Sequence, residues 1–426
     1  MTFGYQQYAT AAASYGGRSN DGQTMDGNST TIGYRYDISE GTNIRLNYRQ
    51  THLRQNYYFD NWDWNGLITP NVITATDLAK AYEGERDSRN AAFQALLDTR
   101  PFNGNQLILG VGRETGDHKT WGKTVNATTI TVSRSESTIN SVFLQDEQRV
   151  GDLTLNAGVR NDRIDLAPDT VNDVPKNGSG SVANVVNPRL GARYKLTDAT
   201  SVYASYGTAY VPALNLYRYV QPSTTRVDNP NLKPESSKTY EVGINNRFGF
   251  GDLRAALYHT DYVDKITLGT DAASGKGQWQ NIAFVKVDGV EIAYQGDLGS
   301  GWLPYSNFTY TKGRDYAKEG ATGTQSIRIA PRKFNAGVTY APNDIWSATL
   351  NARYVSELYF NNLTEAQRAD AYTQVDCKVS TKLPIQGRDM EAFLAVNNLT
   401  GKKYESFNKL EWSDGRSFTV GASGKF

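Results

Sequence analysis

The chain has 426 residues, of which 38% are hydrophobic and 12% aromatic, and its formal net charge is +1. No apolar run approaches the length of about 18 residues that a membrane-spanning helix requires, which excludes a helical membrane protein. The net charge predicts nothing about nucleic-acid binding, but the basic residues are scattered along the chain, which argues against a nucleic-acid groove. Tyrosine-rich, mostly polar sequences suit a sheet with one apolar and one wet face.

The first residues, MTFGYQQYAT, lack the basic and apolar regions of a signal peptide. The single Cys377 excludes an internal disulfide, and three widely spaced histidines show no metal-ligand spacing. The sequence also lacks nucleophile-elbow, phosphate-loop and zinc-protease motifs, so neither an enzyme nor a bound cofactor is expected.

Short turn signals recur along the chain at intervals of roughly 40–60 residues, separated by longer polar loops. Two membrane strands of about ten residues, with overhang and one long loop, fill such an interval. Counting outward from the turns predicts about eighteen strands. The turns are Ser39-Glu40-Gly41, Asn103-Gly104, Gly151-Asp152, Thr197-Asp198, Gly249-Phe250-Gly251, Gly299-Ser300-Gly301, Pro342-Asn343-Asp344 and Gln386-Gly387-Arg388.

The strands between these turns alternate polar and apolar residues, which predicts a sheet with two different faces. Leu153, Leu155 and Val159 are expected to face lipid, whereas Asn156 and Arg160 face the lumen. The same alternation puts Asn335, Asn351 and Arg353 on the wet face. A soluble β-sandwich also alternates, but its strands usually have about five or six residues. The sequence therefore predicts an all-β protein, an antiparallel transmembrane β-barrel.

One segment departs from this pattern between Asn61 and Glu85. Thr76–Tyr82 has helical propensity and is expected to form a short helix in a loop.

Several segments together resemble the barrel of the TonB-dependent outer-membrane receptors. Their order along the chain, from Ser141 to Phe426, carries the resemblance. They are Ser141–Glu147, Leu153–Arg160, Asn187–Gly191, Ser201–Gly207, Val211–Leu214, Asn229–Glu235, Val287–Glu291, Val396–Tyr404 and Gly415–Phe418.

The resemblance implies that residues 1–426 form a receptor barrel with short periplasmic turns and long extracellular loops. The family barrel has 22 strands and a plug domain preceded by a TonB box; about 18 strands are expected here, without plug, TonB box or first strands. It implies a monomer in the bacterial outer membrane, in contact with lipid, that imports a ferric siderophore. Energy from the TonB complex is expected only in the intact receptor. A cobalamin receptor and a passive porin-like channel are the alternatives.

Ligand contacts are expected from aromatic side chains at loop tips and on the wet face, because flat rings beside cations suit ferric siderophores. The alternative role for each ring is the aromatic girdle at the membrane interface. The candidates are Tyr57, Tyr58, Trp62, Trp64, Trp279, Tyr316, Tyr359 and Trp412, with Phe360 beside them.

Four further hypotheses concern individual segments. The run Asn229–Glu235 is interpreted as a structural turn. Residues 215–228 lack the histidine found there in heme-transporting relatives, which disfavours heme. The terminal Phe426 resembles an assembly signal. Two acidic loops are weak calcium candidates, although polar loop aspartates are more often solvated turn formers; their residues are Asp21, Asp26, Asp162, Asp165, Asp169 and Asp173.

Overall fold

The computed structural model describes residues 2–13, 22–60, 80–124, 131–172, 174–175, 180–218, 225–317, 320–360, 363–385, 388–405, 413 and 415–424. Among them, eighteen strands have eight residues or more, which confirms the predicted number. These strands are β1 (Thr2–Ala13), β2 (Gly22–Ser39), β3 (Thr42–Asp60), β4 (Lys80–Thr99), β5 (Asn105–Thr124), β6 (Thr131–Val150), β7 (Leu153–Leu166), β10 (Ser181–Lys195), β11 (Thr200–Val211), β12 (Glu235–Phe248), β13 (Gly251–Thr270), β14 (Gly277–Gly296), β15 (Trp302–Tyr316), β17 (Arg332–Tyr340), β18 (Trp346–Val355), β21 (Tyr372–Ile385), β22 (Arg388–Asn397) and β23 (Ser417–Gly424).

The remaining elements are short and lie between the long strands. No helix among the described residues is long and apolar enough to cross a membrane. The short elements are β8 (Thr170–Val171), β9 (Val174–Pro175), α2 (Asn215–Arg218), β16 (Thr324–Gln325), β19 (Leu358–Tyr359), a 3-10 helix (Glu365–Gln367) and β20 (Arg368–Ala369).

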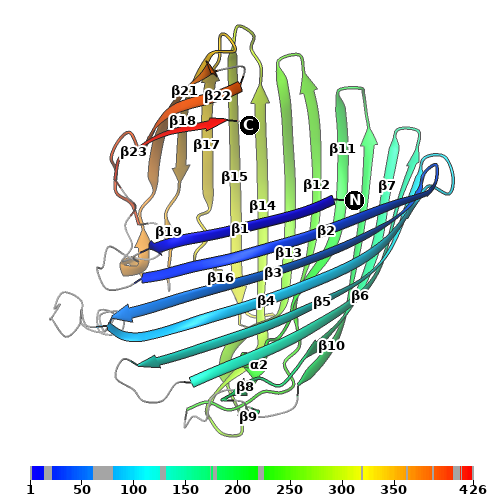
Figure 1. Ribbon diagram of the computed structural model, residues 1–426, viewed down its shortest axis with the longest axis vertical. Helices are drawn as coiled ribbons and strands as arrows, with labels where there is room; N and C mark the ends of the chain where they lie inside the picture. Colours follow the sequence, from blue (N-terminus) through cyan, green and yellow to red (C-terminus); the bar gives the residue numbers. More distant parts are fainter. Residues whose placement is uncertain are drawn as a thin grey trace.

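Every long strand pairs antiparallel with the long strand before it in the chain. In Figure 1, β1 to β6 slope across the near wall and β11 to β15 form the far wall, so the sheet curves into a barrel wall. In the described part of the chain, no pairing joins β1 to β23, and these two strands are the edges of the sheet.

Seven of the eight predicted turns join neighbouring long strands, and Gln386 and Gly387 of the eighth lie outside the described residues. The turn after β2 uses Gly41 at φ 79°, and the turn after β6 uses Gly151 at φ 55°; glycine adopts this backbone conformation without steric cost. Most connections at the opposite ends of the strands are longer, as between Val211 and Glu235. The sheet therefore has a short-turn end and a long-loop end.

The helix predicted over Thr76–Tyr82 is wrong at its described end. Lys80–Tyr82 begins β4, where Lys80 pairs with Asp60 and Tyr82 pairs with Thr124. Hydrogen bonding to two neighbouring strands outweighs a local helical propensity. Thr76–Ala79 lies outside the described residues.

The two faces of the sheet differ as the alternation predicts. Leu155 and Val159 are exposed on one face of β7, together with Val142 of β6. Arg160 projects from the other face, where it forms an ion pair with Asp162. We call the face that bears the exposed apolar side chains the outward face, and the other the lumen face.

Aromatic rings on the lumen face lie across glycines of the neighbouring strand. The Tyr258 ring occupies the space that a Cβ at Gly289 would need, at 2.1 Å from Cζ. Phe143 lies in the same way over Gly110, at 2.2 Å. We call these contacts aromatic–glycine joints; they lock the strand register because a one-residue slip would separate ring and glycine. Further joints are Tyr57–Gly84, Tyr203–Gly243, Tyr305–Gly337 and Phe393–Gly421.

Candidate ligand-binding lumen

Cations lie over aromatic rings at four places on the lumen face. The separations between cation and ring centroid range from 4.7 Å to 5.8 Å, within the distance at which a ring attracts a cation. The ring therefore holds each cation close to the wall while the charge stays inside the barrel. The pairs are Arg86 with Tyr57, Arg160 with Phe143, Arg353 with Tyr372, and Lys378 with Phe393.

The pair in the middle of the wall is neutralised by a buried acid. Arg160 donates from Nε to Asp162 at 2.8 Å and from Nη2 to the Ser141 hydroxyl at 2.7 Å. Asp162 is only 2% exposed. A buried carboxylate needs such a partner, so this group stabilises the wall and does not offer an open charge to a ligand.

The group around Arg353, at the long-loop end, is different. Arg353 donates from Nη2 to Gln374 Oε1 at 3.1 Å and to the Tyr404 hydroxyl at 3.4 Å. The Tyr372 and Tyr404 rings stack at 3.7 Å with an interplanar angle of 3°. Arg353 makes no ion pair with any described acid, so an exposed guanidinium beside stacked phenol rings faces the lumen. We call Arg353, Tyr372, Gln374 and Tyr404 the mouth cluster.

A second open cation lies at the long-loop end of the near wall. The exposed Arg86 covers the Tyr57 ring at 5.1 Å, and Tyr57 is 8% exposed. No described carboxylate pairs with Arg86. The buried Tyr57 ring supports this guanidinium from below and fills the space above Gly84.

The segment Asn229–Glu235 behaves as the structural turn that the sequence predicts. The backbone N–H of Asn231 donates to Asn229 Oδ1 at 3.2 Å, and Asn229 Nδ2 donates to the Trp279 carbonyl at 2.8 Å. The buried Arg218 donates to the carbonyls of Ala213 and Pro230. These bonds fix the long connection between β11 and β12 onto β14.

Those predicted ligand aromatics that the structure describes do not form one group. Trp279 packs against Tyr217 with ring centroids 4.9 Å apart. Tyr316 lies beneath Lys286, and Tyr359 belongs to β19 beside the buried Phe360. Tyr58 lies in β3. Trp62, Trp64, Trp412 and the assembly candidate Phe426 lie outside the described residues.

Sequence reasoning did not select Arg86, Tyr372 or Tyr404. A signal was present for Tyr372, which alternates with Gln374 on the same face along β21. Tyr404 follows the end of β22, and only the fold brings it to Tyr372.

The acidic residues proposed for calcium are dispersed. Asp26 lies within β2 and not in a loop, because pairing with β1 and β3 extends through it. Asp162 is held by Arg160, whereas Asp165 pairs with Arg163 on the opposite face. Asp169 follows β7; Asp21 and Asp173 lie outside the described residues. Within the described ranges, no three His, Cys, Asp or Glu side chains could hold a metal.

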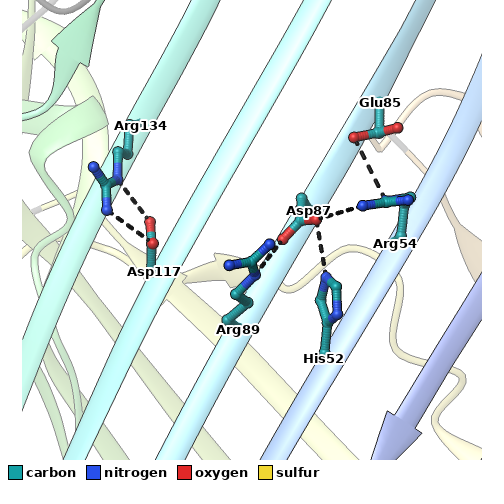
Figure 2. Close-up of polar contacts among 7 residues, drawn as sticks. All are labelled: His52, Arg54, Glu85, Asp87, Arg89, Asp117 and Arg134. Atoms are coloured by element: carbon teal, nitrogen blue, oxygen red, sulfur yellow. Dashed lines mark hydrogen bonds and ion pairs between the residues drawn. The ribbon is translucent and has the colours of Figure 1, made fainter.

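The outward face of β3 to β6 carries a ladder of ion pairs near the long-loop end (Figure 2). The carboxylate oxygens of Asp87 lie 2.9 Å from His52 Nε2, 3.2 Å from Arg89 Nε and 3.5 Å from Arg54 Nη2. On the next two strands, Asp117 accepts two bonds from Arg134, both at 2.9 Å. Arg54 also approaches Glu85 at 3.7 Å. We call these seven residues the paired ladder.

Antiparallel strands in chain order, an apolar outward face and a cation-bearing lumen face define a membrane-type β-barrel. The family model "TonB dependent receptor-like, beta-barrel" matches residues 1–399, and the chain belongs to this family.

Among its relatives, the vitamin B12 transporter BtuB of Photobacterium profundum is 26% identical over 336 residues, which are 76% of this chain and 49% of the relative. The catecholate siderophore receptor Fiu of Escherichia coli O157:H7 is 22% identical over 456 residues, covering 91% and 58%. The closed-form crystal structure of the ferric-catecholate import receptor Fiu from E. coli K12 matches with a TM-score of 0.75 and 18% identity, covering 96% and 65%. The chain thus spans about half to two thirds of the length of these relatives.

Proposed function

We propose that this chain forms the barrel wall of a bacterial outer-membrane receptor that binds a ferric siderophore in its lumen. In the intact receptor, the TonB complex would supply the energy for import. The observation that carries the proposal is the mouth cluster, an exposed guanidinium without a described acid partner next to two stacked tyrosine rings.

The chemistry of a ferric siderophore matches this arrangement. Its iron complex is anionic and presents flat chelating rings. Arg353 offers a guanidinium fork that stays protonated at any physiological pH. The stacked Tyr372 and Tyr404 add ring faces and hydroxyl groups, and Arg86 adds a second open charge on the near wall.

The test is the affinity of the full chain, purified from outer membranes, for a ferric tris-catecholate, followed by quenching of intrinsic fluorescence. Arg353→Gln should weaken binding by about tenfold or more, because a charged hydrogen bond is lost. Arg353→Lys should retain part of the affinity. Arg113→Gln, which removes an outward guanidinium of β5, is the matched control. An unchanged dissociation constant for Arg353→Gln would contradict the proposal.

Cobalamin is the second candidate, favoured by the similarity to a vitamin B12 transporter. The same titration with cyanocobalamin separates the two ligands, since Arg353→Gln should affect a ligand without the iron complex's negative charge much less. Uptake that is independent of TonB would instead favour the passive channel. Heme stays disfavoured by the absence of histidine in residues 215–228.

A further inference from the structure

The outward face of β12 to β17 carries cations that have no acid partner. Each side chain is exposed, and none makes an ion pair with a described carboxylate. This is the reverse of the paired ladder, where every arginine is matched with an acid. We call these residues the open cation patch: Lys238, Lys286, Lys312, Arg314 and Arg332.

The strand register concentrates the charge. Lys286 lies directly opposite Arg314 on β15, and Asp261 lies opposite Lys286 on the other side. In the next row, Lys312 lies opposite Asp288. Like charges at directly opposite positions of an antiparallel pair destabilise the sheet. The sequence nevertheless places two cations, Lys286 and Arg314, at such opposite positions.

The two acids within the patch are both engaged by one histidine. His259 Nδ1 lies 2.7 Å from Asp288 Oδ1, and its Nε2 lies 3.2 Å from Asp261 Oδ1. The carboxylates of Asp261, on β13, and Asp288, on β14, are therefore both directed toward His259. Neither acid lies within ion-pair distance of a cation of the patch.

An apolar band borders the patch on the side of the short turns. Val242 and Leu257 are directly paired and are 52% and 55% exposed, and the row continues to Val290. Lys286 lies ten residues before Gly296, the end of β14. A membrane strand uses about ten residues to cross the hydrocarbon, so the patch lies at the height of the lipid headgroups.

A cavity of about 320 Å³ lies beside the same cations. Lys312 and Arg314 line it from β15, and Ile329 and Pro331 line it from the segment that returns to β17. Tyr310 completes its apolar part. The cavity thus has two open cations and apolar residues in its lining, and the Ile329 side chain lies over Gly313 on the lumen face.

We propose that the open cation patch binds the phosphate groups of a phosphorylated glycolipid in the outer leaflet of the membrane. Its phosphates would lie between Lys286, Lys312 and Arg314, and its acyl chains along the apolar band. A bound anion would relieve the repulsion between Lys286 and Arg314. The proposal depends on the membrane location given under the proposed function, but not on the imported ligand.

The experiment uses the full chain in a neutral detergent with lipid A bisphosphate as the probe. Lys286→Gln combined with Lys312→Gln and Arg314→Gln should weaken lipid A binding by about a hundredfold. Arg54→Gln combined with Arg89→Gln removes cations of the paired ladder at the same height and should leave lipid A binding unchanged. Lysine-to-arginine exchanges at 286 and 312 should preserve it.

Inorganic phosphate and phosphatidylglycerol micelles form the comparison arms. The proposal requires lipid A to bind at least tenfold more tightly than either. Equal binding of inorganic phosphate, or an equal loss in the control variant, would overturn it. If the triple variant does not fold, the single variant Lys286→Gln and the salt dependence of the unmodified chain decide the question. Binding that is insensitive to salt would count against a phosphate site.

Discussion

Two outward-facing regions of the barrel wall lie at the same height but handle charge differently. Arg89 in the paired ladder lies ten residues from the end of β4 at Thr99, as Lys286 lies ten residues from the end of β14. In the ladder, Asp87 contacts the guanidinium groups of Arg54 and Arg89 and the imidazole of His52. In the open cation patch, Lys286 faces Arg314 and neither has a described acid partner.

The difference shows that a row of charges above an apolar band can serve two purposes. Where opposite charges alternate across strands, the pairs stabilise the wall by themselves. Where like charges are opposed, the wall forgoes that stabilisation and keeps charge available for an external anion. The pairing of charges, and not their number, therefore separates a structural surface from a candidate binding surface.

The largest expected effect on the free energy of unfolding comes from substituting glycines on the lumen face. It tests whether the two regions differ only on the outward face. The strands of both regions also carry an aromatic–glycine joint on the lumen face, Phe143 over Gly110 between β6 and β5 and Tyr258 over Gly289 between β13 and β14. Gly110→Val and Gly289→Val should each lower the free energy of unfolding by about 2–3 kcal/mol, because the ring must move. Urea unfolding of the detergent-solubilised barrel measures this. Gly207→Val, where an added Cβ meets nothing within 4 Å, is the control. If the two substitutions lower the free energy of unfolding by very different amounts, the two regions differ on the lumen face as well as on the outward face.

A smaller effect is expected when the ladder loses its central acid. Asp87→Asn leaves His52, Arg54 and Arg89 around a neutral amide, which makes this region resemble the open cation patch. We expect a loss of about 1–2 kcal/mol in unfolding free energy, since the Asp87 side chain is only 13% exposed and joins several partners. Asp37→Asn, which breaks a highly exposed pair with Arg35, should change stability much less. Similar losses in both variants would mean that the ladder contributes nothing as a network.

The fold was largely predictable from the sequence because strand alternation and turn chemistry are local signals. Seven described turns mark strand ends through residues such as Gly41 and Gly151, and the outward position of Leu155 and Val159 follows from alternation alone. The helix predicted over Thr76–Tyr82 was wrong at Lys80–Tyr82 for the opposite reason. Its local propensity competed with hydrogen bonds to β3 and β5, which are far away in sequence.

The candidate site was much less predictable. Aromatic residues such as Trp279 and Tyr316 could be recognised as ring-bearing, but their partners depend on strand register. The mouth cluster joins Arg353, Tyr372 and Tyr404 across three separate segments. Charge patterns have the same limitation, because Lys286 and Arg314 oppose each other only once β14 and β15 are paired.

The smallest expected effect on stability comes from converting the patch into a ladder. Arg314→Glu places an acid directly opposite Lys286, so a repulsive pair becomes an attractive one, and its neighbour on the other side, Gln325, is uncharged. The unfolding free energy should rise by about 0.2–1 kcal/mol, the range for an opposite-charge pair across strands. Lipid A binding should fall at the same time, because the added carboxylate repels phosphate. Arg314→Gln is the matched control: it removes the repulsion without adding an acid, and its stability should fall between the other two. If Arg314→Glu instead destabilises the barrel, Lys286 and Arg314 do not repel each other as the register indicates, and the contrast between the two regions is not one of charge pairing.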